Sequence, residues 1–226
     1  MNSVGLSAIS PIDRAEFEGD LAQWIVAVLE DAILRRMLQP GDRLNADALS
    51  KQLGVSHIPV REALRVLAAR HWIEIRRHQG AFVTSRTAQE LSDLFEVRLC
   101  VEPYSARLGA TRRSSVQVDE LEEIVAAQRR TDDPVRFAEL NAEFHTAIAG
   151  CSQNEQLTRT VSELGARARF YFSPAADLRH DRSINEHCAI LRAVRNRDPE
   201  SAESLTFQHI DDTRLDVLAL LRADGS

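Results

Sequence analysis

Apolar residues recur every three to four positions over the opening part of the chain, the spacing expected of one buried helix face. This pattern predicts a helix from Leu21 to Arg36, which stops before the turn signal Pro40-Gly41. Asn45 is a suitable N-cap for a short second helix through Leu53, and Gly54 then stands where a left-handed C-cap is expected. The chain is therefore predicted to begin with two helices separated by a tight turn.

A third helix is expected to begin two or three residues after Gly54. Its buried stripe consists of Val60, Ala63, Leu64 and Leu67. A different face of the same helix carries His57, Arg61 and Arg65 at positions i, i+4 and i+8. The helix thus presents basic side chains on a face that does not enter the core.

Two short β-prone runs follow, Trp72–Ile75 and Ala81–Thr84, on either side of a basic turn that contains Gly80. A glycine in such a turn allows a tight hairpin. Helix, helix, turn, helix and hairpin is the element order of a winged helix-turn-helix, whose second motif helix enters the DNA major groove.

From Thr87 onward the apolar pattern has helical period and predicts no strand. Helices are expected at about Ala88–Ala110, Val116–Arg130, Pro134–Gly150, Gln153–Phe172, Asp181–Arg197 and Pro199–Arg222. The predicted fold class is mainly α, with an N-terminal winged helix-turn-helix and a C-terminal all-helical antiparallel bundle. Three parts are expected: a flexible arm over 1–17, the winged helix-turn-helix over 18–86 and the helical domain over 87–226, with the boundary between Ser85 and Thr87.

The composition favours a cytoplasmic protein that does not enter a membrane. No apolar run approaches the roughly 20 residues of a membrane span, and Met1–Asp20 carries four acidic residues where a secretion signal needs a basic start. Three cysteines, Cys100, Cys151 and Cys188, lie far apart without a CxxC pair. We therefore expect free thiols and neither a disulfide framework nor a thiolate zinc site.

Charge is unevenly spread along the chain. The net charge is -6, yet between Arg43 and Arg86 eight basic residues face three acidic ones, so this segment carries +5 and the remainder -11. A basic module attached to an acidic body is typical of a nucleic-acid-binding protein with a second domain of another kind.

The sequence resembles a known family at Pro40–Leu44, Leu49 and Leu53–Leu64. These residues (PGDRL, L and LGVSHIPVREAL) resemble the winged-helix signature of GntR-type bacterial transcription regulators. The later helices resemble the all-helical effector domain of the FadR subfamily, the FCD domain. The resemblance spans about Leu21 to Arg222 and implies a homodimeric, ligand-responsive regulator that binds a palindromic double-stranded DNA operator.

Candidate DNA contacts lie on the third helix, at its start, and around the hairpin. They are Arg43, Ser56, His57, Arg61, Arg65, Gln79 and Gly80. The resemblance implies phosphate and base contacts for Ser56, Arg61 and the region of Gly80. The family usually has Arg in the place of His57, and because His offers a single donor where Arg can bond guanine bidentately, we expect an altered base preference. The alternative for Arg61 and Arg65 is a merely solvated helix face.

A second candidate site contains three histidines. Asn141 and His145 are four apart and share one helix face, while His187 and His209 lie along the apolar stripes of two later helices. Inward-pointing imidazoles from three helices can meet in a bundle core. The FCD pattern, Asp-x-x-x-His followed by two later histidines, implies that these four residues bind a divalent metal; the alternative is a polar pocket that binds effector without metal.

Asn141 stands where many family members have Asp. Its neutral amide oxygen lacks the charge that attracts a cation, so we expect weaker metal binding than at a carboxylate site. Three imidazoles with one oxygen donor suit Zn²⁺ or Ni²⁺ better than Mg²⁺ or Ca²⁺.

Arg98 and Glu102 form an i, i+4 pair that matches a positively charged pocket position of the family. A buried Arg suits the carboxylate of a small organic acid, whereas the alternative is a surface ion pair of little energetic consequence. Arg169 is a further candidate for the same effector cavity.

Together these features favour a transcription regulator, a repressor by default, that is released from DNA by a small carboxylate bound beside or on a metal. A metal-dependent hydrolase carrying a winged helix is the runner-up, but no HExxH or GxSxG motif accompanies the histidines. A third alternative, a protein-interaction module, is disfavoured by the basic residues of the third helix and hairpin.

Overall fold

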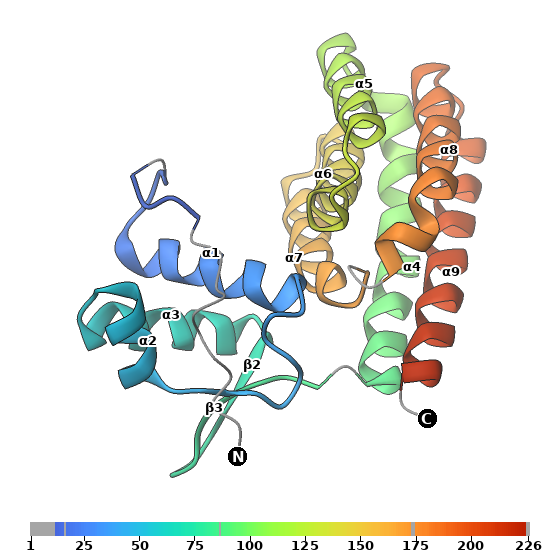
Figure 1. The fold of residues 1–226 in the computed structure, drawn as a ribbon. Helices are drawn as coiled ribbons and strands as arrows, with labels where there is room; N and C mark the ends of the chain where they lie inside the picture. The colour runs from blue at the N-terminus through green and yellow to red at the C-terminus, as the bar shows by residue number, and fades with distance from the viewer. Residues whose placement is uncertain (1–11, 16, 86, 173–174, 225–226) are drawn as a thin grey trace. The chain divides into compact units, whose positions relative to one another are not determined.

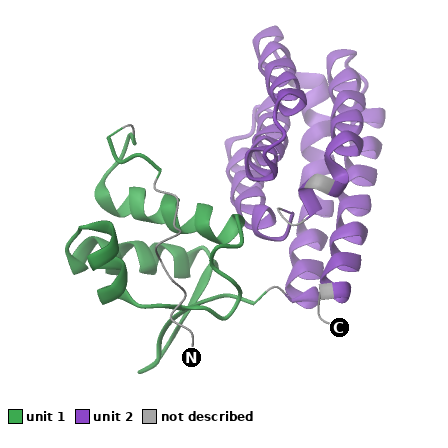
Figure 2. Cartoon of the chain, in the orientation of Figure 1, with its two compact units in different colours: residues 1–85 green, residues 86–226 purple. Residues whose placement is uncertain are grey.

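The computed structural model describes residues 12–15, 17–85, 87–172 and 175–224, and its contacts divide the chain into two compact units, 1–85 and 86–226 (Figure 2). Most of the arm expected over 1–17, and Arg86 at the expected domain boundary, lie outside the described residues.

The described part of unit 1 consists of three helices and a small sheet (Figure 1). Its elements are α1 (Leu21–Leu34), β1 (Arg43–Leu44), α2 (Ala46–Leu53), α3 (His57–Ala69), β2 (Ile73–Arg76) and β3 (Gly80–Val83). The strands are antiparallel in the order β1-β3-β2, and Ile73 pairs with Val83. This is the expected winged helix-turn-helix.

The caps predicted for α2 are confirmed. Asn45 Oδ1 accepts hydrogen bonds from the backbone N–H groups of Asp47 and Ala48 at 2.9 and 3.2 Å. Gly54 ends the helix in the left-handed conformation, with φ +65°. Because both ends are specified locally, the turn that leads into α3 has a defined geometry.

Strand β1 was not expected from the sequence. It contains only Arg43 and Leu44, which pair with Phe82 and Ala81 of β3. Two residues are too few to show the alternation that identifies a strand, so tertiary pairing decides their conformation.

The regular elements of unit 2 are helices throughout its described residues, as expected. Its elements are α4 (Ala88–Arg112), α5 (Ser115–Arg130), α6 (Pro134–Cys151), α7 (Glu155–Phe172), α8 (Ala176–Arg195) and α9 (Pro199–Asp224). Helix α4 packs antiparallel along α9, and α6 packs against α7 (Figure 1). Apolar residues from α4, α5, α6, α8 and α9 form one buried cluster that includes Ala106, Leu121, Phe144, Ile190 and Ala202.

Helices α4 and α6 approach closely at Gly109. A Cβ atom there would lie 3.0 Å from Cβ of Cys151 and 3.1 Å from the carbonyl oxygen of Ile148. The missing side chain therefore permits the contact between the two helices that contribute Glu102 and His145.

Helix α8 begins at Ala176, whereas the sequence pattern predicted a start near Asp181. Its first turn buries Arg179, whose side chain is 1% exposed and pairs with Glu186 at 2.8 Å and with Asp216. A helix face buried through ion pairs carries no apolar period, which explains why the pattern missed it.

Candidate functional site

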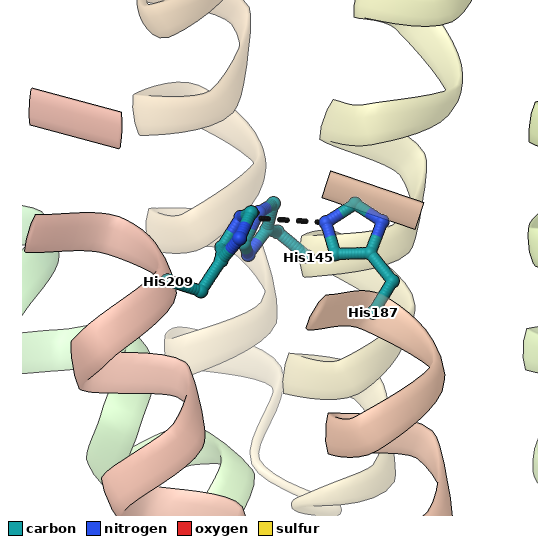
Figure 3. A group of neighbouring side chains, drawn as sticks. All are labelled: His145, His187 and His209. Atoms are coloured by element: carbon teal, nitrogen blue, oxygen red, sulfur yellow. Dashed lines mark hydrogen bonds between the residues drawn. The ribbon is translucent and has the colours of Figure 1, made fainter. Parts of the chain in front are cut away.

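Three histidines from α6, α8 and α9 meet inside unit 2 (Figure 3). Nε2 of His209 lies 3.1 Å from Nε2 of His145 and 3.3 Å from Nε2 of His187. All three side chains are buried, and one ring nitrogen from each lies within 4.8 Å of the others. The ring nitrogens are thus close enough to bind one cation.

The opposite ring nitrogen of each histidine, Nδ1, has its own partner. The Nδ1 contacts are Glu102 Oε2 at 2.8 Å for His145, Gln128 Oε1 at 2.9 Å for His187 and Glu186 Oε2 at 2.7 Å for His209. An acceptor at Nδ1 favours the tautomer that is protonated at Nδ1, and in that tautomer the lone pair of Nε2 can bind a cation. This is the arrangement by which metal-binding histidines are oriented in proteins.

Burial favours the neutral form of two of these imidazoles. Desolvation holds the pKa of His187 and of His209 well below the usual range, and the neighbouring imidazoles and the guanidinium groups of Arg179 and Arg98 lower both further. Because a metal binds the neutral imidazole, these two side chains are in the ligating form at neutral pH.

Arg98 and Glu102 form a buried ion pair rather than a surface one. Both side chains are 3% exposed, and Arg98 Nε lies 2.5 Å from Glu102 Oε1. Burial would raise the pKa of Glu102, but the charge of Arg98 and the contacts with His145 outweigh it and lower this pKa to about 2. Glu102 is therefore ionised and holds His145 on one side and Arg98 on the other.

Asn141 is buried one helical turn before His145, on the same face of α6. Its Oδ1 atom finds no hydrogen-bond partner among the described residues. A buried acceptor without a partner is costly, and a bound cation would supply one. Three imidazole nitrogens and one amide oxygen form a donor set that fits Zn²⁺ or Ni²⁺.

Arg169 lies elsewhere in unit 2. It lines a groove of about 650 Å³ over α5, α6 and α7, and its Nη2 lies 3.2 Å from Glu139 Oε1. The described lining of this groove contains none of the three histidines. Arg98 and Glu102 are thus brought to the histidine cluster, whereas Arg169 is not.

Gln128, Glu186 and Arg179 belong to the surroundings of the cluster but were not predicted from the sequence. Gln128 is fully buried, and Arg179 donates to Glu186 Oε2, the same oxygen that contacts His209. Only the spacing of Arg179 and Glu186 could have indicated them in the sequence, since these two residues lie two helical turns apart on one face of α8.

The candidate DNA contacts of unit 1 are all exposed. Ser56 is the N-cap of α3 and His57 its first residue, with His57 Nδ1 3.2 Å from Asp47 Oδ1. Gln79 lies in the turn between β2 and β3.

Arg43, Arg61, Arg65 and Gly80 are brought together, because they line one open cavity of about 430 Å³. Gly80 has φ +110°, and a Cβ atom there would lie 3.3 Å from Arg43 Nε. The positive φ thus favours glycine in the hairpin, and a side chain there would also displace the guanidinium of Arg43 slightly.

Comparison with protein families assigns both units. Residues 21–83 match the gntR family of bacterial regulatory proteins, and residues 93–212 match the FCD domain. The chain belongs to the gntR family of bacterial regulators, in the subgroup that carries an FCD effector domain, and it is a DNA-binding transcription regulator.

Individual relatives agree with this assignment. The chain is 30% identical to the galactonate operon transcriptional repressor of Escherichia coli K12, over 82% of this chain and 92% of the relative. It is 29% identical to the Nta operon transcriptional regulator of Aminobacter aminovorans, over 81% and 88%. These relatives are regulators and not enzymes, which decides against the hydrolase considered above.

Solved structures share the fold. Escherichia coli McbR/YncC superimposes with a TM-score of 0.67 at 20% identity, covering 92% of this chain and all of that one. A GntR family member from Pseudomonas syringae pv. tomato has a TM-score of 0.53 at 22% identity, covering 90% and 87%. Within the described part of the chain, no helix has the length and apolar character needed to cross a membrane.

Proposed function

We propose that this regulator is a repressor released from its operator by a small organic acid, which binds in a metal-containing pocket of unit 2. One observation carries the proposal: three buried imidazoles converge through Nε2 while each Nδ1 is held by an acceptor. Histidines that only stabilised a core would not need their nitrogens to face one another.

Asn141, His145, His187 and His209 would hold the cation, which we take to be Zn²⁺ or Ni²⁺. When bound, such a metal attracts and orients a carboxylate oxygen as a Lewis acid. The protein side chains orient the imidazoles, burial keeps those of His187 and His209 neutral, and the buried charge of Arg98 favours an organic anion nearby.

The DNA-binding part of the proposal rests on α3 and the hairpin. Arg61 and Arg65 project from one exposed face of α3 and share a cavity with Arg43. An exposed basic helix beside a basic hairpin suits the major groove and its phosphates. We propose that Ser56, His57, Arg61, Arg65, Arg43, Gln79 and Gly80 form the contact surface.

Repression, dimerisation and location complete the proposal. A relative with 30% identity is named a repressor of the galactonate operon, and galactonate is itself a carboxylate. One winged helix covers only a short half-site, so a homodimer on a palindromic operator would supply the specific affinity. A regulator of bacterial DNA acts in the cytoplasm.

Fluorescence anisotropy with labelled DNA from the region upstream of the protein's own gene tests the proposal. We expect binding that weakens when Zn²⁺ and a matching small carboxylate are both present. The variant His187→Ala should bind the same DNA but no longer respond. DNA release by the carboxylate at equal strength in His187→Ala would contradict a role for the histidine pocket.

A further inference from the structure

Two chains of paired charges end at the histidine cluster. In one, Arg98 pairs with Glu102, which accepts from His145. In the other, Arg179 pairs with Glu186, which accepts from His209. Each carboxylate that touches a histidine is therefore already neutralised by a guanidinium.

The remaining members of the cluster are neutral. His187 has the amide of Gln128 as its Nδ1 partner, and the oxygen expected to complete the donor set is the amide Oδ1 of Asn141. Glu186 also contacts Arg182, and the other carboxylates near Arg179 are Asp216 and, through Arg182, Asp212. The side chains of Glu186, Asp216 and Asp212 are 22%, 34% and 21% exposed, so water screens the charge of all three.

A divalent cation entering this cluster thus meets no unbalanced buried negative charge. Burying a charge without compensation is costly in free energy. An anion that binds beside the cation removes most of this cost, because the two charges then compensate each other at short range.

We propose that the pocket takes up its divalent cation and a small carboxylate together, each raising the affinity for the other, so that the metal is a co-effector and not a permanently bound ion. The inference rests on the proposed function, and it makes Asn141 the residue that determines this dependence. A carboxylate at position 141 would supply the missing charge from the protein itself.

Calorimetric titration of chelator-stripped protein with Zn²⁺ tests whether the affinity for Zn²⁺ depends on a carboxylate. Acetate is the probe, because it is the smallest carboxylate with a methyl group and fits wherever a larger carboxylate head group fits. The control titration contains sodium chloride at equal ionic strength in place of acetate. We expect 50 mM acetate to lower the Kd for Zn²⁺ at least tenfold. Reciprocally, saturating Zn²⁺ must tighten acetate by at least this factor, because the shift at 50 mM acetate is a lower bound on the coupling.

Two variants make the same chemical change at different places. Asn141→Asp should bind Zn²⁺ at least tenfold more tightly than the natural protein without acetate, and acetate should then change its Kd less than threefold. Asn196→Asp introduces the same charge at an exposed position at the end of α8 and should behave like the natural protein.

The results separate this inference from the proposed function. An identical Kd for Zn²⁺ with and without acetate would overturn the co-effector inference, while the metal-containing pocket would stand. Absence of Zn²⁺ binding under both conditions would overturn both. If Asn141→Asp does not fold, the two titrations of the natural protein still decide.

Discussion

At the scale of single residues, Arg61 carries the clearest assignment in unit 1. It is exposed on α3, and it lines the same cavity as Arg43 and Gly80. Arg61→Ala should weaken operator binding by about 1 to 3 kcal/mol if the guanidinium contacts a base, or weaken all DNA sequences alike if it contacts a phosphate. Anisotropy titrations at fixed salt measure the difference.

Arg192→Ala is the matched control, because it removes an equal charge from an exposed position on α8. It should leave DNA affinity unchanged. Equal affinity of Arg61→Ala and the natural protein at moderate salt would remove α3 from the contact surface.

His57 should determine part of the base preference. Its imidazole lies near Asp47, whereas an arginine at the same first position of α3 could bond bidentately to guanine. His57→Arg should therefore favour operators with a guanine at the contacted position. Binding-site selection with both proteins checks this, and an identical consensus would show that residue 57 contacts no base.

The histidine cluster should make the stability of unit 2 depend on metal. With acetate and Zn²⁺ at about a hundredfold above its Kd, the folded state gains roughly 2.7 kcal/mol by mass action, which corresponds to about 5 to 10 °C in Tm. Excess chelator should reverse this gain. Differential scanning fluorimetry measures the shift.

His187→Ala should abolish the response to chelator, whereas His78→Ala, in the exposed turn between β2 and β3, should retain it. If the histidines were only core residues, chelator would leave the natural protein unchanged, and Asn141→Asp would be destabilised by an uncompensated buried charge.

At the scale of elements, Gly109 and Gly150 allow a paired prediction about helix packing. Gly109→Ala should destabilise unit 2 by about 1 to 3 kcal/mol, because the new methyl group meets α6 at 3.0 Å. Gly150→Ala adds the same group where no atom lies within 4 Å, and the helix propensity of alanine should stabilise α6 by up to about 1 kcal/mol. Urea unfolding of both variants measures whether the free energy of unfolding changes in opposite directions.

Elements defined by an apolar stripe or a local cap could be predicted from the sequence. Asn45 and Gly54 specify the ends of α2 by short-range hydrogen bonding and backbone geometry. The start of α8 and strand β1 could not be predicted, because ion pairs of Arg179 and pairing with β3 determine them from a distance.

The residues of the candidate site likewise include some that the sequence could predict and some that it could not. His145, His187 and His209 point along apolar stripes and match a family pattern, so the sequence predicted their convergence. Gln128 and Glu186 came to light only in the structure, since the partner of an imidazole Nδ1 follows no period. Arg169 was proposed for the effector cavity; in the structure it contacts Glu139 and lines a groove whose described lining contains none of the three histidines.

At the scale of the whole molecule, the regulator should be a homodimer at micromolar concentration, because a single winged helix contacts too short a half-site for specific affinity. Sedimentation velocity, free and with a palindromic duplex, measures the mass. A monomer in both samples would exclude the proposed operator geometry.

The histidine cluster joins α6, α8 and α9, and its partners Glu102 and Gln128 add α4 and α5. Residues of five helices thus meet at this cluster, and whatever occupies it acts as a reversible cross-link between them. Resistance of unit 2 to a protease should then rise only with the right anion. A collection of organic acids can be screened by this resistance alone, so the physiological effector can be sought before the operator is known.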